Sequence, residues 1–478
     1  MSILPDYESV ISERQKSYNK PFFVIVFLFF LWGFITVMND VLIPHLKAVF
    51  ELSYFQAALI QFAFFGAFFI ISLIYFITSV SIGDPISKIG YKNGIIIGLI
   101  LCGIGCCLFY PAANHQRYEV FLGALFVLAS GVTILQITAN PYAAILGKPK
   151  TASSRLNLAQ GFNSFGTTLA PIVGAALLYK VFSNGEITIE SLKMPYLIYG
   201  CLFFVLAIIV KFVNLPSFIN TEKIEKGLGV LKFRHVVLGM FAIFFYVGGE
   251  VSIGSFLINF FGLETVMGME EAEAGVFLSY YWGGAMIGRF LGSVSMSEMT
   301  DKIKKYLLMA LLSVFFFFIL YFITAIKIEA GTFSIQFLSF SKIWLFVVFL
   351  ISNYLFFLIG GTKSSKLLTL FVVIVIVLLL IMILCNGQIA FWSAIAIGAF
   401  NSILWSNIFT LAIKDLGKYT SQASSLLVMM IVGGALIPLL QGIVADYIGI
   451  KLSFFIPVVC YGYLVFYGLV GYKIKHTL

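Results

Sequence analysis

Two carboxylates stand inside long apolar stretches of this sequence, where an ionisable side chain is costly. Asp40 follows Asn39 on the first apolar stretch, and Glu250 lies on a later one among glycines and serines. A charge at the centre of a membrane helix costs about 2.5–3.5 kcal/mol on insertion scales, so such residues are mostly functional. We predict that both carboxylates bind a coupling cation, Na⁺ or H⁺. The alternative is that each is a buried acid held by neighbours for packing.

Pro44 adds to the chemistry expected at Asp40. Proline has no backbone N–H, so a proline four residues further along a helix leaves the carbonyl of Asp40 without its helical partner and should kink the helix. A carboxylate beside a free carbonyl is a predicted site for a cation or a sugar hydroxyl.

Neutral amides form a second group with helical spacing. Gln136 and Asn140 are four residues apart, and Gln160 and Asn163 belong to a polar stripe in the next apolar stretch. An amide both donates and accepts hydrogen bonds, as sugar hydroxyls do. We find no Lys or Arg near the middle of an apolar stretch, which favours a neutral substrate. The sequence therefore predicts that these four amides and Asn39 bind a small neutral sugar. The alternative is helix–helix bonding, worth about 0.6 kcal/mol per bond.

Aromatic side chains accompany amides in the second half of the chain. Trp405 stands four residues after Asn401, and Trp282 follows two tyrosines. An aromatic face can stack on the C–H face of a sugar ring while an amide bonds its hydroxyls. We predict that Asn401, Trp405 and Trp282 complete the substrate site. A tryptophan at the lipid interface or in the core is the alternative.

The elements that must position these residues are membrane helices. Of the 478 residues, 61% are hydrophobic and 11% are charged, and the mean hydropathy is +1.04. A soluble domain carries about 25% charged residues. Apolar runs of about 20 residues, the length of a membrane span, recur from residue 21 to residue 474, and strand-like alternation is absent. We predict an all-α membrane protein with about 14 transmembrane helices.

The placement of basic residues predicts the orientation. With the N-terminal tail (1–20) inside, only seven of the 30 Lys and Arg residues fall outside: Lys47, Arg117, Lys180, Lys193, Lys327, Lys342 and Lys451. This bias follows the positive-inside rule and explains the net charge of +9 without nucleic acid. The expected location is a plasma membrane, such as a bacterial inner membrane, crossed many times with both termini cytoplasmic.

The chain also repeats itself. Asn140, Gly166 and Pro171 recur as Asn407, Gly433 and Pro438 at one constant offset, whereas the segment at Asp40 recurs at Glu250 with a smaller offset. The difference is long enough for two extra spans. We predict a six-helix bundle at 21–215, a charged cytoplasmic linker at 216–233, and a second bundle at 234–478 that contains a two-helix insertion near 327–385, after the ninth span.

A charged loop joins the second and third spans on the cytoplasmic side. It contains Asp84 between glycines and lysines, and Arg289 is placed correspondingly after span eight. We predict that Asp84 and Arg289 belong to gating loops that contact the opposite bundle. A solvated inner loop is the alternative.

Enzymatic chemistry has no support in the sequence. The six cysteines lie in apolar stretches, without metal-ligand spacing to His, and no nucleophile–base pair stands out. We expect no catalytic residue, no bound metal and no cofactor besides the coupling cation. The partners expected for a monomer are the sugar, that cation and the lipid bilayer.

Several motifs resemble a known family. They are Phe30-Leu-Trp-Gly33 with Asn39-Asp40, Thr138-Ala-Asn-Pro-Tyr142, Arg155-Leu-Asn-Leu-Ala-Gln160 with Phe162-Asn-Ser-Phe-Gly166, Tyr281-Trp-Gly-Gly284 with Gly288-Arg289, Asn401-Ser402 with Asn407-Ile-Phe409, and Gln441-Gly-Ile-Val-Ala-Asp446. Nearly the whole chain outside the insertion resembles the fucose:proton symporter family of the major facilitator superfamily, and more closely its glucose/galactose transporter branch. The resemblance implies the major facilitator fold, Asp40 as the proton-titrating carboxylate, and Gln160 and Asn163 as sugar-contacting amides.

One departure from that family concerns the substrate. The fucose symporter has a membrane Glu in the fourth helix where this chain has Gln136. A neutral amide there favours a hexose site and permits sodium coupling. We therefore expect a symporter that imports a neutral hexose, glucose or galactose, by alternating access. A fucose:proton symporter is one alternative. The other is a facilitator-type exporter of drugs or metabolites, which the Gly/Pro pattern from Gly166 to Gly174 resembles.

Overall fold

The structure is a computed structural model that describes residues 19–50, 54–176, 192–216, 227–329 and 332–474; within these ranges the side chains of residues 39–49, among others, are not described. The first half contains six long helices: α2 (Asn19–Val49), α3 (Tyr54–Ile82), α4 (Pro85–His115), α5 (Tyr118–Ile145), α6 (Ala152–Ala176) and α7 (Lys193–Phe212). Short 3₁₀ turns, η1 (Pro149–Thr151) and η4 (Gly229–Lys232), precede α6 and α8. Pro44 lies within α2, which continues to Val49.

The second half has more elements. Its helices are α8 (Arg234–Phe261), α9 (Glu271–Ser295), α10 (Lys302–Ala325), α11 (Phe340–Gly360), α12 (Ser364–Leu384), α13 (Gly387–Asn401), α14 (Leu404–Ala412), α15 (Thr420–Met429), α16 (Gly433–Ile448), α17 (Ile450–Ser453) and α18 (Phe455–Phe466). The short 3₁₀ helices η5 (Gly417–Tyr419) and η6 (Met430–Val432) and the π-helix η7 (Tyr467–Gly471) adjoin them. Strands β1 (Ile326–Glu329) and β2 (Thr332–Ile335) form an antiparallel hairpin after α10, in which Ile326 pairs with Ile335.

The helical segments agree with the predicted number of spans. In the described part of the chain, 12 segments are long and apolar enough to cross a membrane, with α13–α14, α15–α16 and α17–η7 each counted as one. Helices α6 and α9 are also long enough, at 25 residues each, but they are more polar. With these two the total is fourteen, and the prediction of an all-α membrane fold is confirmed.

Apolar side chains cover the outside of the molecule. Phe212, Ile303 and Val459 are 78%, 81% and 71% exposed. Such exposure over a whole surface is unfavourable in water but is expected where lipid is the solvent. Polar side chains such as Asn140, Gln160 and Asn401 are buried between the helices, together with a large apolar core.

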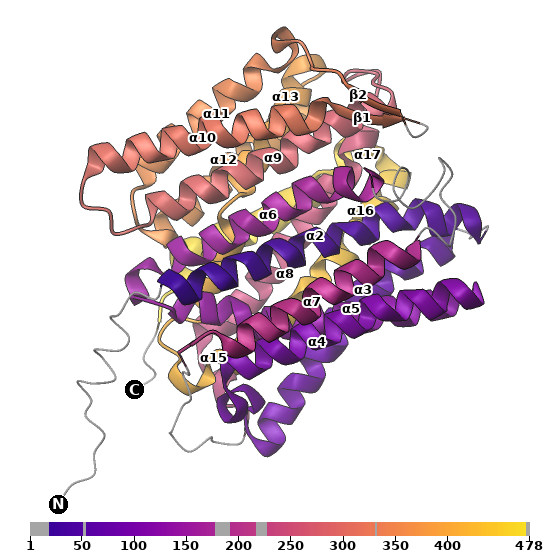
Figure 1. Cartoon of the computed structure of the whole chain (residues 1–478). Coiled ribbons are helices and arrows are strands. Elements are labelled where there is room, and N and C mark those ends of the chain that lie inside the picture. Colours follow the sequence, from indigo (N-terminus) through magenta and orange to yellow (C-terminus); the bar gives the residue numbers. More distant parts are fainter. Residues whose placement is uncertain (1–18, 51–53, 177–191, 217–226, 330–331, 475–478) are drawn as a thin grey trace, which may run out of the picture.

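The two halves share one packing scheme. In the first half α2 packs along α6, α3 packs along α5, and α4 packs on both α5 and α7. In the second half α8 packs along α16, α9 along α13, and α12 on both α13 and α18. Figure 1 shows the two groups as layers of side-by-side helices, α2–α7 in indigo to magenta and the later helices in pink to yellow. The predicted relation between the halves is thus visible in their packing.

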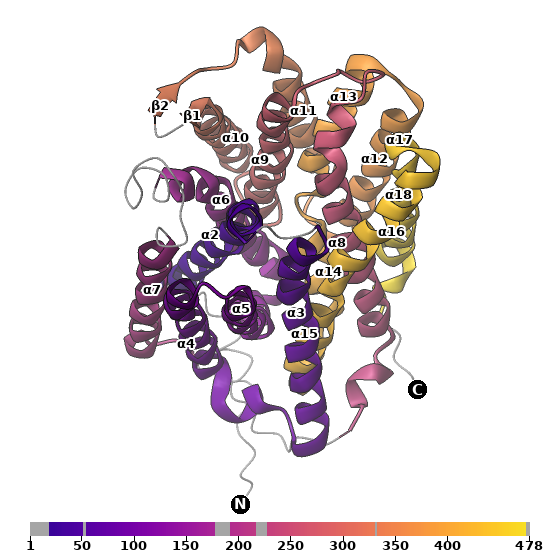
Figure 2. The same ribbon diagram turned by 90° about the vertical axis from the view of Figure 1, so that its right-hand side faces the viewer.

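This scheme corrects the position of the insertion. Helix α12 takes the place in the second half that α4 takes in the first, so the additional pair is α10 and α11 (Lys302–Gly360) and not the predicted 327–385. Figure 2, viewed close to the helix axes, shows α10 and α11 at the edge of the molecule beyond α9. The repeat offset measures how much sequence was added. It cannot tell which of several equally apolar neighbouring spans was added, because that depends on packing.

Helices from the two halves meet mainly where α6 lies against α9 and α14, and α3 and α5 lie against α15. We call the end of the bundle that carries Lys88, Lys148, Arg234 and Lys302 the basic end. Most of the predicted linker, residues 217–226, lies outside the described part of the chain.

Candidate functional site

A broken membrane helix forms the centre of the second-half site. Helix α13 ends at Asn401 and α14 begins at Leu404, so Ser402 and Ile403 interrupt the helical hydrogen bonding. The Tyr246 hydroxyl donates to the Asn401 carbonyl over 3.1 Å, and Arg289 Nε donates to the Ser402 carbonyl over 3.1 Å. Unwound carbonyls of discontinuous helices commonly line transport sites.

Glu250 and Asn401 belong to the same cluster of buried side chains. The same Tyr246 hydroxyl shares its one proton with Glu250 Oε1, the nearer acceptor at 2.7 Å, and Arg289 Nη2 lies 3.6 Å from that carboxylate oxygen. The Asn401 amide donates to the Tyr281 hydroxyl over 3.1 Å, and its Oδ1 accepts from the Tyr461 hydroxyl over 2.7 Å. We call these six residues the second-half polar cluster. It brings together three predicted residues (Glu250, Arg289 and Asn401).

Arg289 is not in a loop, which corrects its predicted role. It lies within α9, with a side chain that is 14% exposed, and α9 continues to Ser295. Besides bonding to Glu250 and Ser402, its Nη1 donates to the Ser164 hydroxyl on α6 of the other half. The expectation that no Lys or Arg is buried within a span was therefore also wrong. Arg289 is compatible with a membrane helix because a carboxylate, a carbonyl and a hydroxyl bind its guanidinium.

The predicted amides of the first half come from α5 and α6. Gln160 Nε2 lies 3.4 Å from Asn140 Oδ1, and Gln136 stands one turn before Asn140. The three side chains are 9%, 0% and 7% exposed in the order Gln160, Asn140 and Gln136. Asn140 Nδ2 is buried and has no hydrogen-bond partner in the described part of the chain. We call these residues the first-half amide group; its unpaired donor is the kind of group that a bound hydroxyl would satisfy.

Asn163 has a packing contact. Its Nδ2 donates to the Phe29 carbonyl on α2 over 3.0 Å. An added Cβ at Gly33 would lie 2.1 Å from the Asn163 carbonyl, so α2 and α6 approach closely here. The structure thus gives Asn163 the helix-bonding contact that the sequence left open as an alternative.

Asn39 and Asp40 lie on α2, which packs along α6; the preceding Met38 lies against Gly174 near the end of α6, whereas Asn163 meets α2 at Phe29 and Gly33. The side chains of Asn39 and Asp40 lie outside the described residues. Their predicted contacts with substrate and cation stay predictions.

The two tryptophans have different neighbours. The Trp282 ring meets the Tyr281 ring edge-on at 4.9 Å and packs against Gly254 of α8, and it remains 36% exposed. Trp405 is partly buried and stacks on Phe409, with ring centres 5.0 Å apart. Ser402 and Ile403 interrupt the helix between Asn401 and Trp405, so the two residues belong to successive helices, α13 and α14.

Asp84 lies at a contact between the halves at the basic end. It caps α4, accepting from the Ser87 backbone N–H over 2.9 Å, and it accepts hydroxyl bonds from Tyr75 on α3 and from Ser421 on α15. The predicted location of Asp84, at a loop that meets the opposite bundle, agrees with these contacts. Its side chain is buried rather than solvated, with Asp84 1% exposed.

Other polar contacts close the basic end. The Ser153 and Thr410 hydroxyls are 2.6 Å apart, Ser154 donates to the Ser293 carbonyl over 2.5 Å, and Lys148 pairs with Glu298 at 2.9 Å. Each pair joins the first half to the second. Most described hydrogen bonds and ion pairs between the halves lie on the basic side of the bundle, whereas the contacts of Ser164 with Arg289 and of Thr168 with Met286 lie nearer its middle.

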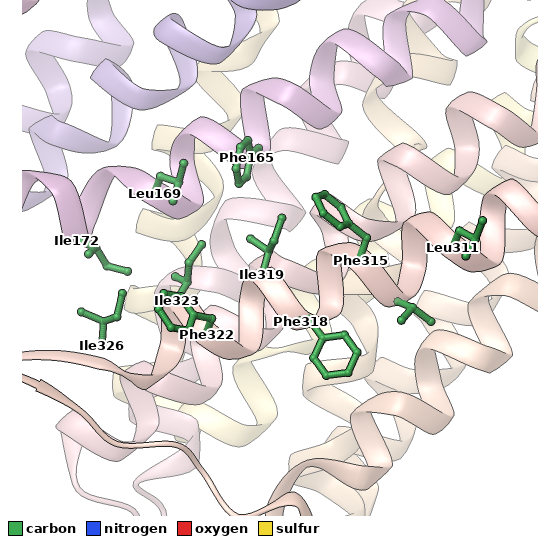
Figure 3. A pocket seen from close by; sticks show the side chains of 11 residues that line it. Phe165, Leu169, Ile172, Leu311, Phe315, Phe318, Ile319, Phe322, Ile323 and Ile326 are labelled. Carbon is green, nitrogen blue, oxygen red and sulfur yellow. The ribbon is translucent and has the colours of Figure 1, made fainter.

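An apolar groove between α6 and α10 is separate from these polar groups. It has a volume of about 710 Å³ and is lined by Phe165, Leu169 and Ile172 of α6 and by residues from Leu311 to Ile326 (Figure 3). It contains no predicted site residue and offers no partner for a hydroxyl, so it is not a sugar site.

Sequence reasoning missed the tyrosines of the second-half polar cluster. Tyr246 stands four residues before Glu250, and this helical spacing could have identified it. Tyr461 is distant along the chain from every other member, and only the packing of α18 against α8 brings it to Asn401. No group of three or more His, Cys, Asp or Glu side chains that could bind a metal occurs among the described residues.

Comparison with known proteins identifies the family. Residues 22–359 match the model of the Major Facilitator Superfamily. The chain is 44% identical to a glucose/galactose transporter of Brucella abortus over 97% of this chain and 96% of the relative. It is 28% identical to the L-fucose-proton symporter of Escherichia coli over 95% of this chain and 94% of the relative. A solved superfamily transporter in the outward conformation has a TM-score of 0.72 and 28% identity, covering 95% of this chain and 99% of its own. The chain belongs to the Major Facilitator Superfamily.

Proposed function

We propose that this chain is a secondary active transporter that imports a neutral hexose, glucose or galactose, together with a cation. The observation that carries the proposal is the first-half amide group, a buried set of neutral donors and acceptors with one unpaired Nδ2. The Brucella relative named as a glucose/galactose transporter, which is similar over almost the whole chain, supports the choice of hexose.

Membership in a superfamily of transporters confirms that the chain is not an enzyme. It also confirms a multi-pass membrane protein, as do the apolar helices.

The proposed substrate site uses side chains of both halves. Gln136, Asn140 and Gln160 would bond the hydroxyls from one side, with Asn39 on the neighbouring α2. Asn401 would bond them from the other side, and Trp282 or Trp405 would cover the apolar ring face. Neutral amides suit a polyol because each can donate to one hydroxyl oxygen and accept from another.

Asp40 is the proposed coupling carboxylate. Glu250 is already balanced by Arg289 at 3.6 Å and by the Tyr246 hydroxyl. It could take up a cation only in a state in which Arg289 has moved away. Binding of H⁺ or Na⁺ at Asp40 would favour the state that accepts sugar, and this difference in affinity between states is what couples the two fluxes.

The orientation follows from charge. Under the positive-inside rule the basic end faces the cytoplasm, and both termini lie there. A structure closed at the basic end then represents an outward-open or occluded state. We propose a bacterial inner-membrane location, a monomer surrounded by lipid, and no cofactor besides the coupling cation.

Counterflow in proteoliposomes tests the function. Labelled glucose, galactose and fucose are offered to purified protein, and accumulation is then driven by a proton or a sodium gradient. We expect exchange of glucose or galactose and a clear loss of apparent affinity in Gln160→Leu, with Asn93→Ala as a control amide variant at the exposed start of α4. Failure of every sugar to exchange would refute the proposal.

L-Fucose with H⁺ is the second candidate. The E. coli relative named as an L-fucose-proton symporter is 28% identical over 95% of this chain. Gln136 argues against it, because the resemblance expects a titratable Glu at that position. Exchange of fucose in preference to glucose and galactose, driven by protons alone, would favour this candidate.

A further inference from the structure

Asn353 is a fully buried amide on a helix of the inserted pair. It lies on α11, a helix with many lipid-exposed apolar residues, and it is 0% exposed. Its Nδ2 donates to the Ala399 carbonyl over 2.9 Å, whereas its Oδ1 has no partner among the described atoms. Burying an amide is costly unless it makes hydrogen bonds, so the single bond of Asn353 needs a reason.

Ala399 lies two residues before the end of α13. Three carbonyls at this break, those of Ala399, Asn401 and Ser402, accept no backbone N–H in the described structure. Each accepts a side-chain donor from a different helix instead. These donors are Asn353 Nδ2 from α11, the Tyr246 hydroxyl from α8, and Arg289 Nε from α9.

The neighbouring helices fit closely around the same segment. An added Cβ at Gly398 would lie 2.0 Å from the Tyr281 carbonyl, and one at Gly288 would lie 2.3 Å from the Ser402 hydroxyl. Phe356, on the same helix as Asn353, meets Phe400 with ring centres 5.7 Å apart. Helices α9 and α11 thus hold the end of α13 from two directions.

We propose that Asn353 is a positioning residue that stabilises the break between α13 and α14 and thereby orients Asn401. This proposal gives the inserted pair α10–α11 a structural role, because α11 supplies one of the three hydrogen-bond donors that the carbonyls of the broken helix require. Without that donor the Ala399 carbonyl is buried and unsatisfied, and the end of α13 loses its fixed position. The expected effect of Asn353 on sugar affinity rests on the proposed function, whereas its expected effect on the order of the break between α13 and α14 does not.

The test compares variants of the full chain in lipid nanodiscs. Asn353→Leu keeps the volume and removes the donor, and Asn353→Ala serves if the leucine variant does not fold. Ser352→Ala is the matched control, because its neighbouring hydroxyl is exposed and bonds only to Val348 of its own helix. Hydrogen exchange measured by mass spectrometry reports the order of residues 399–405, and proteoliposome uptake of glucose gives KM and Vmax.

In both Asn353 variants we expect exchange in 399–405 to become at least fivefold faster, while the remainder of α13 keeps the wild-type rate. The KM for sugar should rise at least fivefold, and Vmax per folded protein should stay within twofold. If the Asn353 variants kept the wild-type rate of hydrogen exchange and the wild-type KM, the proposal would be overturned. It would also be overturned if hydrogen exchange became faster evenly over α11–α14, because that result indicates a purely structural role. If the wild-type protein carries no hexose, the proposed function fails, and the exchange measurement still decides the role of Asn353.

Discussion

Arg289 and Glu250 form an ion pair between membrane helices, with side chains 14% and 12% exposed. Removing one partner of a buried pair is strongly destabilising, by about 3–5 kcal/mol, because the other charge is left uncompensated, whereas removing both is often tolerated. The sequence analysis identified both residues but predicted separate roles for them, cation binding for Glu250 and a gating loop for Arg289. Because the two charges neutralise each other, each side chain can stay charged inside the membrane only while the other is present.

A double-mutant cycle tests this pairing. We expect Arg289→Met to lower the thermal stability in detergent strongly, Glu250→Gln to lower it less, and the double variant to recover most of the loss. The stability can be followed by fluorescence-detected gel filtration after heating. Additive losses in the double variant would show that the two side chains do not depend on each other.

Asp40 is the residue on which coupling is proposed to depend. Asp40→Asn keeps the size and loses the charge that distinguishes cation-bound from cation-free protein. We expect it to abolish gradient-driven accumulation in proteoliposomes while sugar counterflow continues. Asp415→Asn is the control, since Asp415 is exposed in a left-handed turn (φ 57°) that asparagine also adopts. Accumulation that survives in Asp40→Asn would assign coupling to another group.

At the scale of elements, the approach of α9 to α13 determines where the site residues lie. Gly398 packs directly against the Tyr281 backbone, and Gly284 and Gly288 lie against Ala399 and Ser402. Small residues at such contacts allow membrane helices to approach closely. This contact places Arg289 next to the break and Tyr281 next to Asn401.

Gly398→Ala tests the close approach. A Cβ there would lie 2.0 Å from the Tyr281 carbonyl oxygen, so the two helices must separate. We expect a loss of stability of about 1–3 kcal/mol, the usual cost of overpacking a core, together with weaker sugar binding. Gly462→Ala on α18 has open space around its Cβ and should leave thermal stability and uptake unchanged or slightly improved. Equal behaviour of the two variants would contradict the packing argument.

At the scale of the whole molecule, the structure is closed at the basic end by contacts between the halves. Asp84 with Ser421, Ser153 with Thr410, and Lys148 with Glu298 come from different helix pairs. Alternating access requires all of them to separate when the opposite state forms. The closure therefore determines from which side of the membrane the substrate can reach the site.

A disulfide across this closure should stop transport. The Ser153 and Thr410 hydroxyls are 2.6 Å apart, so cysteines at both positions would lie within bonding reach. In a background without the native cysteines, we expect the oxidised Ser153→Cys/Thr410→Cys variant to lose uptake and to regain it on reduction. Each single variant should transport under both conditions. Uptake that continues with the disulfide formed would show that this end does not open.

Much of the architecture followed from the sequence. Lipid penalises polar backbone and charge so strongly that the apolar runs predicted the spans, and the cost of Glu250 and of the amides on α6 marked them as candidate site residues. Local spacing also predicted that Gln136 and Asn140 share one face of a helix, and the charged loop around Asp84 was predicted to contact the opposite bundle.

Only the tertiary structure decided which partners these residues have. Helix α13 ends at Asn401 and Trp405 lies in α14, although their spacing fits one continuous helix. Arg289 lies in a span because Glu250, on another helix, neutralises it, and Tyr461 reaches Asn401 from the last helix. The identity of α10–α11 as the added pair also depends on packing. Helical periodicity records which face of one helix is buried, but contacts between helices depend on how they cross, and no local pattern encodes that crossing.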